Sequence, residues 1–347
     1  MPNKCTQWEY WPPLMIYIPL LPYALYLALK AKSFGFFSAV NPSLEGSGNG
    51  LESKYKSIQL LPDKNKPKTI FIPKEETVSV ILEKMQLLNL SFPLIIKPDI
   101  GFRGLLVQKI NSEFELKNYI YKYRSINLML QEFIDYKNEC GIFYYRLPNE
   151  KKGVITSITI KKYPSVVGDG KSNILQLIMA DERSRIYLEI ITELNKGSLK
   201  NIPDKNEEVI LSIIGNHAKG TQFINGNHLI TDKLQIYFDK FCENIEGWNY
   251  GRFDIKYSNF EELITKDSFK ILEMNGIISE PTHIYDASKG NYFDALKTIK
   301  AHWKILYKIG VGNHRIYQTN YTDLRYFINS IINIKKYMVK LSRLAAT

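Results

Sequence analysis

Short apolar runs alternate with amphipathic stretches through the middle of the chain. Apolar side chains recur at helical spacing over residues 75–88, 174–182 and 188–194, which predicts three helices. Runs rich in Ile, Leu, Phe and Tyr predict strands, and these lie at 94–97, 105–110, 128–133, 141–147, 154–159, 251–257 and 269–275. The first two of these strands pair around a glycine-containing loop, and the last two pair around a loop rich in Ser, Asn and Asp. Hairpins mixed with helices indicate an α+β fold rather than the regular βαβ units of a doubly wound sheet.

The N-terminal region contains a long uncharged run from Tyr10 to Leu29. Its length would suit one membrane crossing, but Pro19 and Pro22 interrupt a helix and its aromatic side chains are typical of a membrane interface. The lysines that follow favour a cytoplasmic location for the next segment. Two interpretations stay open: a membrane-associated segment that spans, re-enters or lies on the bilayer, or an element packed inside the protein.

The C-terminal residues 331–347 carry Lys335, Lys336, Lys340 and Arg343 and no acidic residue. Apolar side chains between them recur near helical spacing, which predicts a basic amphipathic helix. Such a helix lies on an anionic membrane or packs on its own domain with its basic side in solvent.

Composition and charge narrow the classes of protein. The 347 residues are 45% hydrophobic and 23% charged, so the chain can form a real core. The net charge of +11 favours anionic partners such as nucleotides, nucleic acid or anionic lipid. A nucleic-acid binder is the weaker alternative, because the basic residues are scattered or terminal and form no recognition motif. The three cysteines, Cys5, Cys140 and Cys242, show neither a disulfide framework nor a zinc-ligand spacing, and free thiols are expected.

The strongest chemical signal lies on the last pair of predicted strands. Glu273 and Asn275 are two residues apart on one strand, so their side chains point to the same face. Asp254 joins them from the neighbouring strand, and Arg252 projects beside it. Carboxylate and amide oxygens are ligands that suit Mg²⁺ together with substrate phosphates. The pattern therefore predicts a magnesium site for a nucleotide.

An apolar strand ending at Lys97 precedes a turn that contains Gly101 and Gly104. A lysine at a strand end can bind phosphate as a point charge, and glycines allow backbone N–H groups to approach the phosphate closely. An ordinary hairpin with a surface lysine has the same pattern.

The predicted strand over 128–133 ends in Gln131 and Glu132, and Glu139 follows seven residues later. An extended segment can offer backbone groups to an adenine edge, and a carboxylate can accept hydrogen bonds from ribose hydroxyls. Alone, this pattern is also a plain strand followed by a turn.

Two further glycine-rich segments carry basic residues. The first, residues 160–173, contains Gly-Lys-Ser, but Ser165 stands where a P-loop requires glycine, so we expect a mobile loop that closes over a site. The second contains Asn216, His217 and Lys219 between two glycines. His217 could act as a base or could be a structural hydrogen-bonded residue.

In chain order, Lys-Pro-x-x-Gly-x-x-Gly from Lys97, Gln-Glu-Phe-Ile from Gln131, Gly-Asp-Gly-Lys-Ser from Gly168, Gly-Arg-Phe-Asp from Gly251 and Leu-Glu-Met-Asn-Gly-Ile from Leu272 resemble the ATP-grasp superfamily. The resemblance covers roughly residues 50–300 and points to carboxylate–amine ligases similar to D-alanine–D-alanine ligase and cyanophycin synthetase. It implies an ATP-grasp fold, in which two α+β subdomains grip ATP, here with an apolar N-terminal segment and a basic C-terminal helix. The implied regions are an apolar segment, a pre-grasp linker, the N-subdomain, the C-subdomain with the metal site and a basic helical tail, at 1–34, 35–72, 73–130, 131–300 and 301–347.

The resemblance also implies residue roles. The metal ligands are Asp254, Glu273 and Asn275, holding two Mg²⁺ ions that Mn²⁺ could replace. The residues implied to act on the transferred phosphate or the substrate are Arg252, Lys97, His217 and Lys219. The residues implied to bind ATP are Lys54, Lys97, Gly101, Gly104, Gln131, Glu132, Ile134, Glu139 and Lys162. The short region before Lys54 departs from the family pattern, in which a soluble pre-grasp domain helps to build the substrate site.

The expected activity is ATP-dependent joining of a carboxylate to an amine through an acyl phosphate, with release of ADP and phosphate. The alternative is a non-catalytic nucleotide-binding or scaffold protein of the same fold. We expect residues 10–29 and 331–347 to contact a membrane on its cytoplasmic face, and we expect no specific nucleic acid partner.

Overall fold

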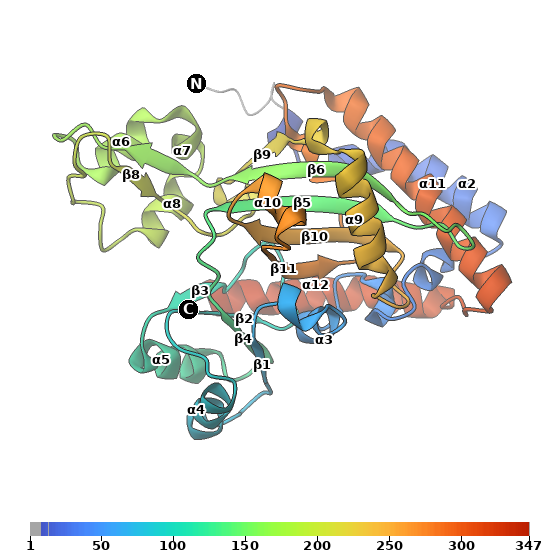
Figure 1. The fold of residues 1–347 in the computed structure, drawn as a ribbon, viewed down its shortest axis with the longest axis horizontal. Helices are drawn as coiled ribbons and strands as arrows, with labels where there is room; N and C mark the ends of the chain where they lie inside the picture. Colours follow the sequence, from blue (N-terminus) through green and yellow to red (C-terminus); the bar gives the residue numbers. More distant parts are fainter. Residues whose placement is uncertain (1–7, 13, 347) are drawn as a thin grey trace.

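The structure is a computed structural model that describes residues 8–12 and 14–346. Two antiparallel sheets with helices around them form its centre (Figure 1). This architecture confirms the α+β prediction. Short helices lie in the connections between the main elements: η3 (Phe36–Ala39), η4 (Glu45–Ser47), α3 (Lys54–Gln59), η5 (Asp63–Asn65), η6 (His217–Lys219), η7 (Asn227–Leu229) and η8 (Thr282–Tyr285).

The smaller sheet has the strand order β1-β4-β2-β3. Its bounds are β1 (Thr69–Ile72), β2 (Leu94–Pro98), β3 (Gln108–Ile110) and β4 (Leu128–Glu132). Helices α4 (Val78–Leu87) and α5 (Glu113–Tyr123) bury their apolar sides against this sheet. Because β1 pairs with β4, the sheet begins at Thr69, ahead of the subdomain start expected at residue 73. The predicted strand over 105–110 is shorter, because residues 102–106 form the turn before β3.

The larger sheet has the order β11-β10-β5-β6-β9. Its bounds are β5 (Asn138–Tyr145), β6 (Val154–Lys162), β9 (Gln222–Asn225), β10 (Tyr250–Tyr257) and β11 (Phe269–Asn275). Ile142, Phe253 and Ile255 point to one face, which α9 (Asp232–Glu243) and α10 (Phe260–Thr265) cover (Figure 1). The side chains that alternate with them face the other way, and on that face the polar residues gather. The loop expected between the last two strands contains α10, which Asn259 caps by accepting a hydrogen bond from the Glu261 N–H.

A small lobe projects between β6 and β9. It consists of β7 (Ser165–Val167), β8 (Glu208–Ile210), α6 (Ile174–Ala180), α7 (Glu182–Ile186) and α8 (Leu188–Leu194) around its own apolar cluster. The prediction of one mobile loop over 160–173 is wrong, because most of this stretch is anchored. Residues 160–162 end β6, Val166 is buried in the lobe, and the Asp169 carboxylate accepts hydrogen bonds from the next turn.

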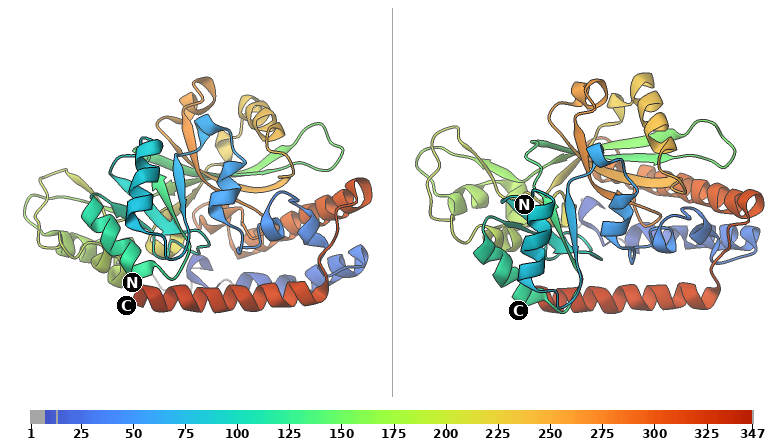
Figure 2. Two further views of the ribbon diagram at one scale, coloured as in Figure 1. Left: turned by 90° about the horizontal axis from the view of Figure 1, so that it is seen from below. Right: turned by 60° about the horizontal axis from the view of Figure 1, so that its bottom comes forward.

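The N-terminal helices and the last helix of the chain lie at the bottom of the left view in Figure 2. The N-terminal part comprises η1 (Trp8–Tyr10), α1 (Leu14–Tyr17), η2 (Ile18–Leu20) and α2 (Leu21–Ala31), and the C-terminal part comprises α11 (Tyr292–Tyr317) and α12 (Leu324–Ala346). The tail helix predicted over 331–347 is the second part of α12. Near its start Phe327 contacts Phe37, and near its end Leu341 is buried in the core of the smaller sheet.

Among the described residues, one segment is long and apolar enough to cross a membrane by length and composition, Leu14–Ala31. In the structure it divides into three helical pieces. Its inner side packs on the protein, with Ile16 and Leu20 against Ile284 and Ile299. Of the cysteines, Cys140 and Cys242 are buried free thiols, and Cys5 lies outside the described residues.

Candidate functional site

A cavity of about 1270 Å³ lies between the two sheets. Strands of both sheets, the N-terminal segment and α12 all contribute to its wall. Most of the predicted site residues line it: Lys54, Lys97, Gly101, Gly104, Gln131, Glu132, Ile134, Glu139, His217, Arg252, Asp254, Glu273 and Asn275.

The larger-sheet wall is centred on Asp254, which lies opposite Glu273 in the register of β10 and β11. Arg252 donates two hydrogen bonds to Asp254, from Nε to Oδ1 at 2.8 Å and from Nη2 to Oδ2 at 3.1 Å. Asn275 Nδ2 donates to Asp254 Oδ2 at 3.3 Å. Gly141 on the neighbouring strand leaves room for the arginine, because a Cβ there would lie 2.9 Å from Arg252 Cδ. The sheet thus brings the predicted carboxylate, amide and arginine together.

A buried lysine links Asp254 to the ribose-binding candidate. Lys161 Nζ lies 2.6 Å from Glu139 Oε1 and 3.2 Å from Asp254 Oδ1. Glu139 also accepts a hydrogen bond from the Tyr163 hydroxyl. Burial opposes the charged state of Asp254, but Arg252 and Lys161 outweigh it and hold the pKa of Asp254 below its usual range. In the free protein Asp254 is therefore ionised and already paired.

Glu273 has its own cation, Lys54, which comes from the N-terminus of α3. The two side chains form an ion pair in the cavity wall, where α3 packs beside β11. Ser53 positions the lysine by capping α3, since its hydroxyl accepts a hydrogen bond from the Lys56 N–H. Burial would raise the pKa of Glu273, but Lys54 lowers it below the usual value.

The smaller-sheet wall presents Lys97 with weak partners. Its Nζ lies 3.1 Å from Gln131 Oε1 and 3.4 Å from the Leu272 carbonyl oxygen. Burial lowers the pKa of Lys97 to about 8, because no carboxylate contacts it closely enough to offset the loss of water. The turn after it places Gly101 and Gly104 on the cavity, and Gly104 takes a φ of +69°, which suits glycine.

Lys162 and Lys219 are the predicted site residues that the structure places outside the cavity lining. Lys162 is exposed on the opposite side of β6, and Lys161 occupies the cavity instead. Side-chain alternation along β6 explains why Lys161 replaces Lys162: Ile158 packs into the core under α9, so Lys161 lies on the opposite face of the sheet, toward the cavity. In the sequence, the apolar residues of this strand already indicate which of its faces is buried, and therefore that Lys161 lies on the other face. Burial lowers the pKa of Lys219, yet its side chain does not line the cavity.

The end of the cavity near His217 is closed by the N-terminal segment. Glu9 Oε2 lies 3.1 Å from His217 Nε2 and 3.4 Å from Arg183 Nη1. Tyr10 and Trp11 continue this wall. Sequence patterns gave no sign of Glu9, because the contact joins residues 208 positions apart. Glu280 was missed as well; it lines the cavity, burial raises its pKa, and its carboxylate accepts a hydrogen bond from Tyr285.

The oxygen donors fit a hard divalent cation by their chemistry. Asp254 and Glu273 face each other across two strands, and the amide of Asn275 lies beside Asp254. No group of three or more His, Cys, Asp and Glu side chains that could hold a metal occurs in the described part of the chain, so the amide must complete the set. Each carboxylate contacts a cation, so a metal would bind as Arg252, Lys161 and Lys54 turn toward another anion.

Comparison with known proteins agrees with this architecture. Residues 51–163 match the family model of the RimK-like ATP-grasp domain. The fold is an ATP-grasp fold. The match confirms the resemblance inferred from the sequence motifs. The match covers about a third of the chain, including Lys54, Lys97, Gln131, Glu139 and Lys161, and it ends before β10 and β11. No curated protein sequence matches the chain.

Solved structures similar to the chain include three ligases. A D-Ala:D-Ser ligase from Enterococcus faecalis has a TM-score of 0.42 at 12% identity, over 78% of this chain and 63% of its own. An L-amino acid ligase from Bacillus licheniformis has a TM-score of 0.41 at 14% identity, over 76% of this chain and 50% of its own. A D-alanine–D-alanine ligase from Coxiella burnetii has a TM-score of 0.43 at 10% identity, over 79% and 62%. The chain thus spans less than two thirds of these three proteins, and none of these likenesses carries an activity over to it.

Proposed function

We propose that the protein is an ATP-dependent carboxylate–amine ligase that works through an acyl phosphate. One observation carries the proposal: on an ATP-grasp fold, Lys97 and the Asp254–Glu273–Asn275 set face one cavity from opposite sheets. A point charge for phosphate and a set of oxygen ligands on facing walls suit a magnesium nucleotide between them.

The chemistry needs no covalent enzyme intermediate. A substrate carboxylate oxygen attacks the γ-phosphorus of ATP, the bond to the β-phosphate oxygen breaks, and ADP leaves. The amine nitrogen then attacks the acyl carbon, phosphate leaves with the bonding electron pair, and the amine loses a proton as the amide forms. Mg²⁺ on Asp254, Glu273 and Asn275, as one or two ions, supplies charge to offset the β- and γ-phosphates.

The residues of the cavity divide this work. Lys97 and Lys54 bind phosphate oxygens, and Gln131 with the following linker residues holds the adenine. Arg252, which lies beside Asp254 at the cavity, would stabilise the transferred phosphoryl group. His217 and Asn216 hold the acyl phosphate or the substrate, and the lobe over 165–211 keeps water away from the acyl phosphate. We further propose that the ligase works on the cytoplasmic face of a membrane.

Release of ADP tests the proposal. Purified protein with Mg²⁺ and ATP is screened over carboxylates and amines, and products are identified by mass spectrometry. We expect ADP release that depends on both partners. Asp254→Asn and Glu273→Gln should each lower it by about 100-fold or more, because each removes a charged ligand of the nucleotide–metal unit.

The control is the fold: both variants should keep the far-UV circular dichroism of the parent protein. Full turnover in both variants would refute the metal assignment. ATP binding without ADP release for every substrate pair would favour the alternative, a nucleotide-binding protein without catalysis.

A further inference from the structure

The outer side of the N-terminal helices is an unusual apolar surface. Leu14 and Leu29 are each 64% exposed, and the residues between them at helical spacing are exposed too. Helix α12 has an outer side of the same kind. We call these two surfaces together the docking face; its apolar members are Leu14, Met15, Ile18, Leu21, Leu25, Tyr26, Leu29, Leu324, Ile328, Ile331, Ile332 and Val339.

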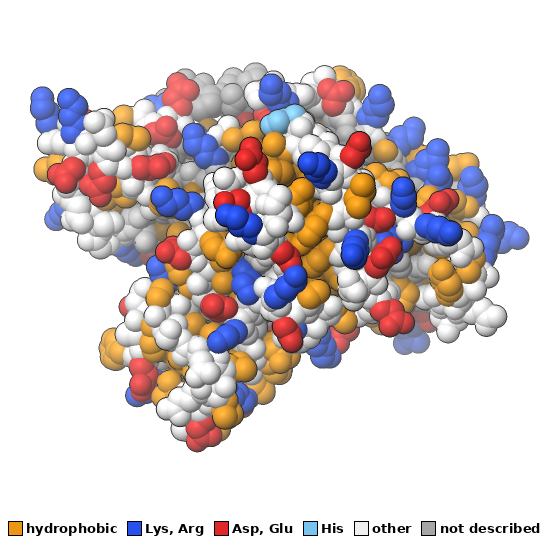
Figure 3. Space-filling view, viewed as in Figure 1, with side chains coloured by type: hydrophobic (Ala, Val, Ile, Leu, Met, Phe, Trp, Pro, Cys, Tyr) orange, Lys and Arg blue, Asp and Glu red, His pale blue; other side chains and the backbone are white. Residues whose placement is uncertain are grey.

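The regions that carry the docking face also hold the net charge of the protein. Residues 10–44 and 295–347 contain twelve Lys and Arg but a single acidic residue, Asp323. The rest of the chain therefore has 34 basic and 34 acidic residues, so these two regions account for the whole net charge of +11. On the opposite side of the molecule, acidic and basic side chains are interspersed (Figure 3). Seven of these twelve basic residues belong to α2, its C-cap Lys32 or α12, which carry the docking face, and the other five belong to α11.

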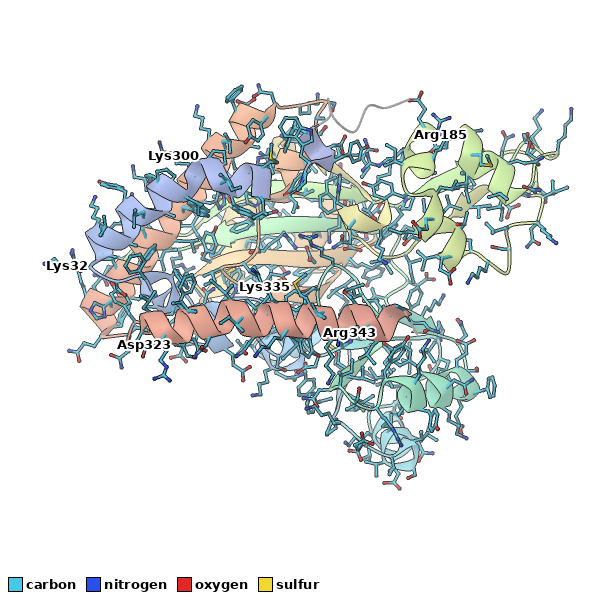
Figure 4. The ribbon with its side chains drawn as sticks, turned by 180° about the vertical axis from the view of Figure 1, so that it is seen from behind. Lys32, Arg185, Lys300, Asp323, Lys335 and Arg343 are labelled. Atoms are coloured by element: carbon cyan, nitrogen blue, oxygen red, sulfur yellow. The ribbon has the colours of Figure 1, made fainter. Side chains whose placement is uncertain are left out.

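The two halves of the docking face lie on one side of the protein. In the left view of Figure 2, α2 and α12 lie together below the sheets, and Figure 4 shows both helices on the near side, with Lys32 and Lys335 labelled. The layer also borders the cavity. Trp11 and Tyr17 line the cavity from the N-terminal segment, and Ile334 and Met338 line it from the inner side of α12.

We propose that the docking face rests on an anionic lipid bilayer and that the cavity takes an amphiphilic substrate from it. The apolar side chains enter the interface while the flanking lysines and arginines contact anionic headgroups, which is how basic amphipathic helices bind membranes. The second half of the inference rests on the proposed function: the joined carboxylate or amine belongs to a molecule whose apolar part stays in the bilayer.

The N-terminal helices lie on the bilayer rather than cross it. Helix α2 has 11 residues, which at 1.5 Å per residue span about 16 Å, roughly half of a hydrocarbon core. The inner side of α2 packs against the rest of the protein, where Leu27 and Ala28 contact Phe36 and Trp303. Crossing the bilayer would require these buried contacts to break.

A bilayer explains the surface better than a second copy of the chain does. Two copies joined through this face would place two strongly positive regions against each other, which like-charge repulsion opposes. An anionic surface complements both the apolar side chains and the charge. Charge also accounts for orientation, because the balanced remainder of the chain is not attracted to the same lipid.

Vesicle sedimentation tests the docking. The full-length protein is mixed with vesicles of phosphatidylcholine alone or with phosphatidylglycerol added, and the bound fraction is measured. We expect binding to the anionic vesicles that salt weakens. Leu25→Glu with Val339→Glu should weaken binding by about tenfold or more, because both side chains lose their apolar contact with lipid.

The matched control places the same charges at exposed apolar positions elsewhere. Leu87 on α4 is 82% exposed and Phe114 on α5 is 73% exposed, and Leu87→Glu with Phe114→Glu should bind vesicles like the parent protein. No binding by the parent protein, or equal loss in both double variants, would overturn the proposal. A concentration-dependent dimer that Leu25→Glu with Val339→Glu disperses would overturn it in favour of a second copy.

The substrate half is tested with hexadecylamine in anionic vesicles against ethylamine in solution. ADP release by the parent protein should rise on the vesicles, and the docking-face variant should lose this rise while keeping its rate with ethylamine. An equal response of the parent and the variant to both amines would overturn this half. The two proposals fail separately: Asp254→Asn must still bind vesicles, and ADP release without vesicle binding would leave the ligase proposal standing.

Discussion

The two walls of the cavity hold their charges in opposite ways. On the larger sheet, Asp254 and Glu139 share Lys161 at 3.2 and 2.6 Å. On the smaller sheet, Lys97 has a neutral amide at 3.1 Å as its closest polar partner, and burial lowers its pKa to about 8. The charges on the larger sheet neutralise each other. On the smaller sheet, Lys97 has lost its water on burial and has no carboxylate partner in its place.

This difference indicates where an anion would bind first. A phosphate gives Lys97 the negative partner it lacks and meets no competing carboxylate there. On the larger sheet an anion must compete with Asp254 for Arg252, unless a metal ion takes the carboxylate. The comparison therefore predicts a nucleotide held first by the smaller sheet and then by the larger one as the metal arrives.

The largest expected effect comes from breaking the neutral pairing of the larger sheet. Lys161→Met leaves Glu139 and Asp254 each with one partner fewer in a buried site, and we expect the free energy of unfolding to fall by about 3 kcal/mol. Lys162→Met is the matched control, because Lys162 is exposed, and we expect a change within about 0.5 kcal/mol. Urea unfolding followed by circular dichroism measures both. Equal stability of the two variants would show that the wall does not depend on Lys161.

The next largest effect, about tenfold on ADP affinity, is expected from the titration of Lys97 on the smaller sheet. Charged Lys97 is the form that binds phosphate, and with a pKa of about 8 it is about 90% charged at pH 7 and about 10% at pH 9. ADP affinity should therefore fall about tenfold as the pH rises through this window, as calorimetric titration can measure. Lys97→Arg keeps its charge across the range and should bind ADP equally at both pH values. A flat profile in the parent protein would contradict the weak pairing of Lys97.

The smallest effect separates the two basic residues near the far end of the cavity. Lys219→Ala should change ADP release by less than about twofold, because the side chain does not line the cavity. His217→Ala should lower it several-fold, because it removes a cavity residue and one partner of Glu9. A larger loss for Lys219→Ala than for His217→Ala would reverse this assignment.

The sequence predicted the central strands well because their signal is local. Residues 128–133 and 269–275 are apolar runs bounded by turn residues, and β4 and β11 begin where those runs begin. Helix α9 was not predicted, and α11 was expected only in part, within a helical tail over 301–347. The 26-residue α11 alternates apolar positions with exposed lysines and is fixed by packing against η3 and α2, which lie far away in the chain.

The same distinction between local and long-range signals applies to the residues of the candidate site. The motif residues Lys97, Gln131 and Asp254 meet at one cavity, and their roles stay predictions. Side-chain alternation decides between Lys161 and Lys162, and it could have been applied once the strand was extended to residue 162. Glu9 could not have been found, because its place in the wall depends on how the N-terminal segment crosses the folded protein.

Helix α12 has a mechanical consequence. It begins beside Phe37 next to the larger sheet, runs past the cavity, and ends with Leu341 in the core of the smaller sheet and Lys340 bonded to the Ser125 carbonyl at 3.0 Å. A helix of 23 residues is stiff, so it acts as a strut fixed at both ends. The two sheets therefore cannot move apart unless the contacts at one end of α12 break. The last helix of this ATP-grasp fold thus holds its two sheets in place relative to each other.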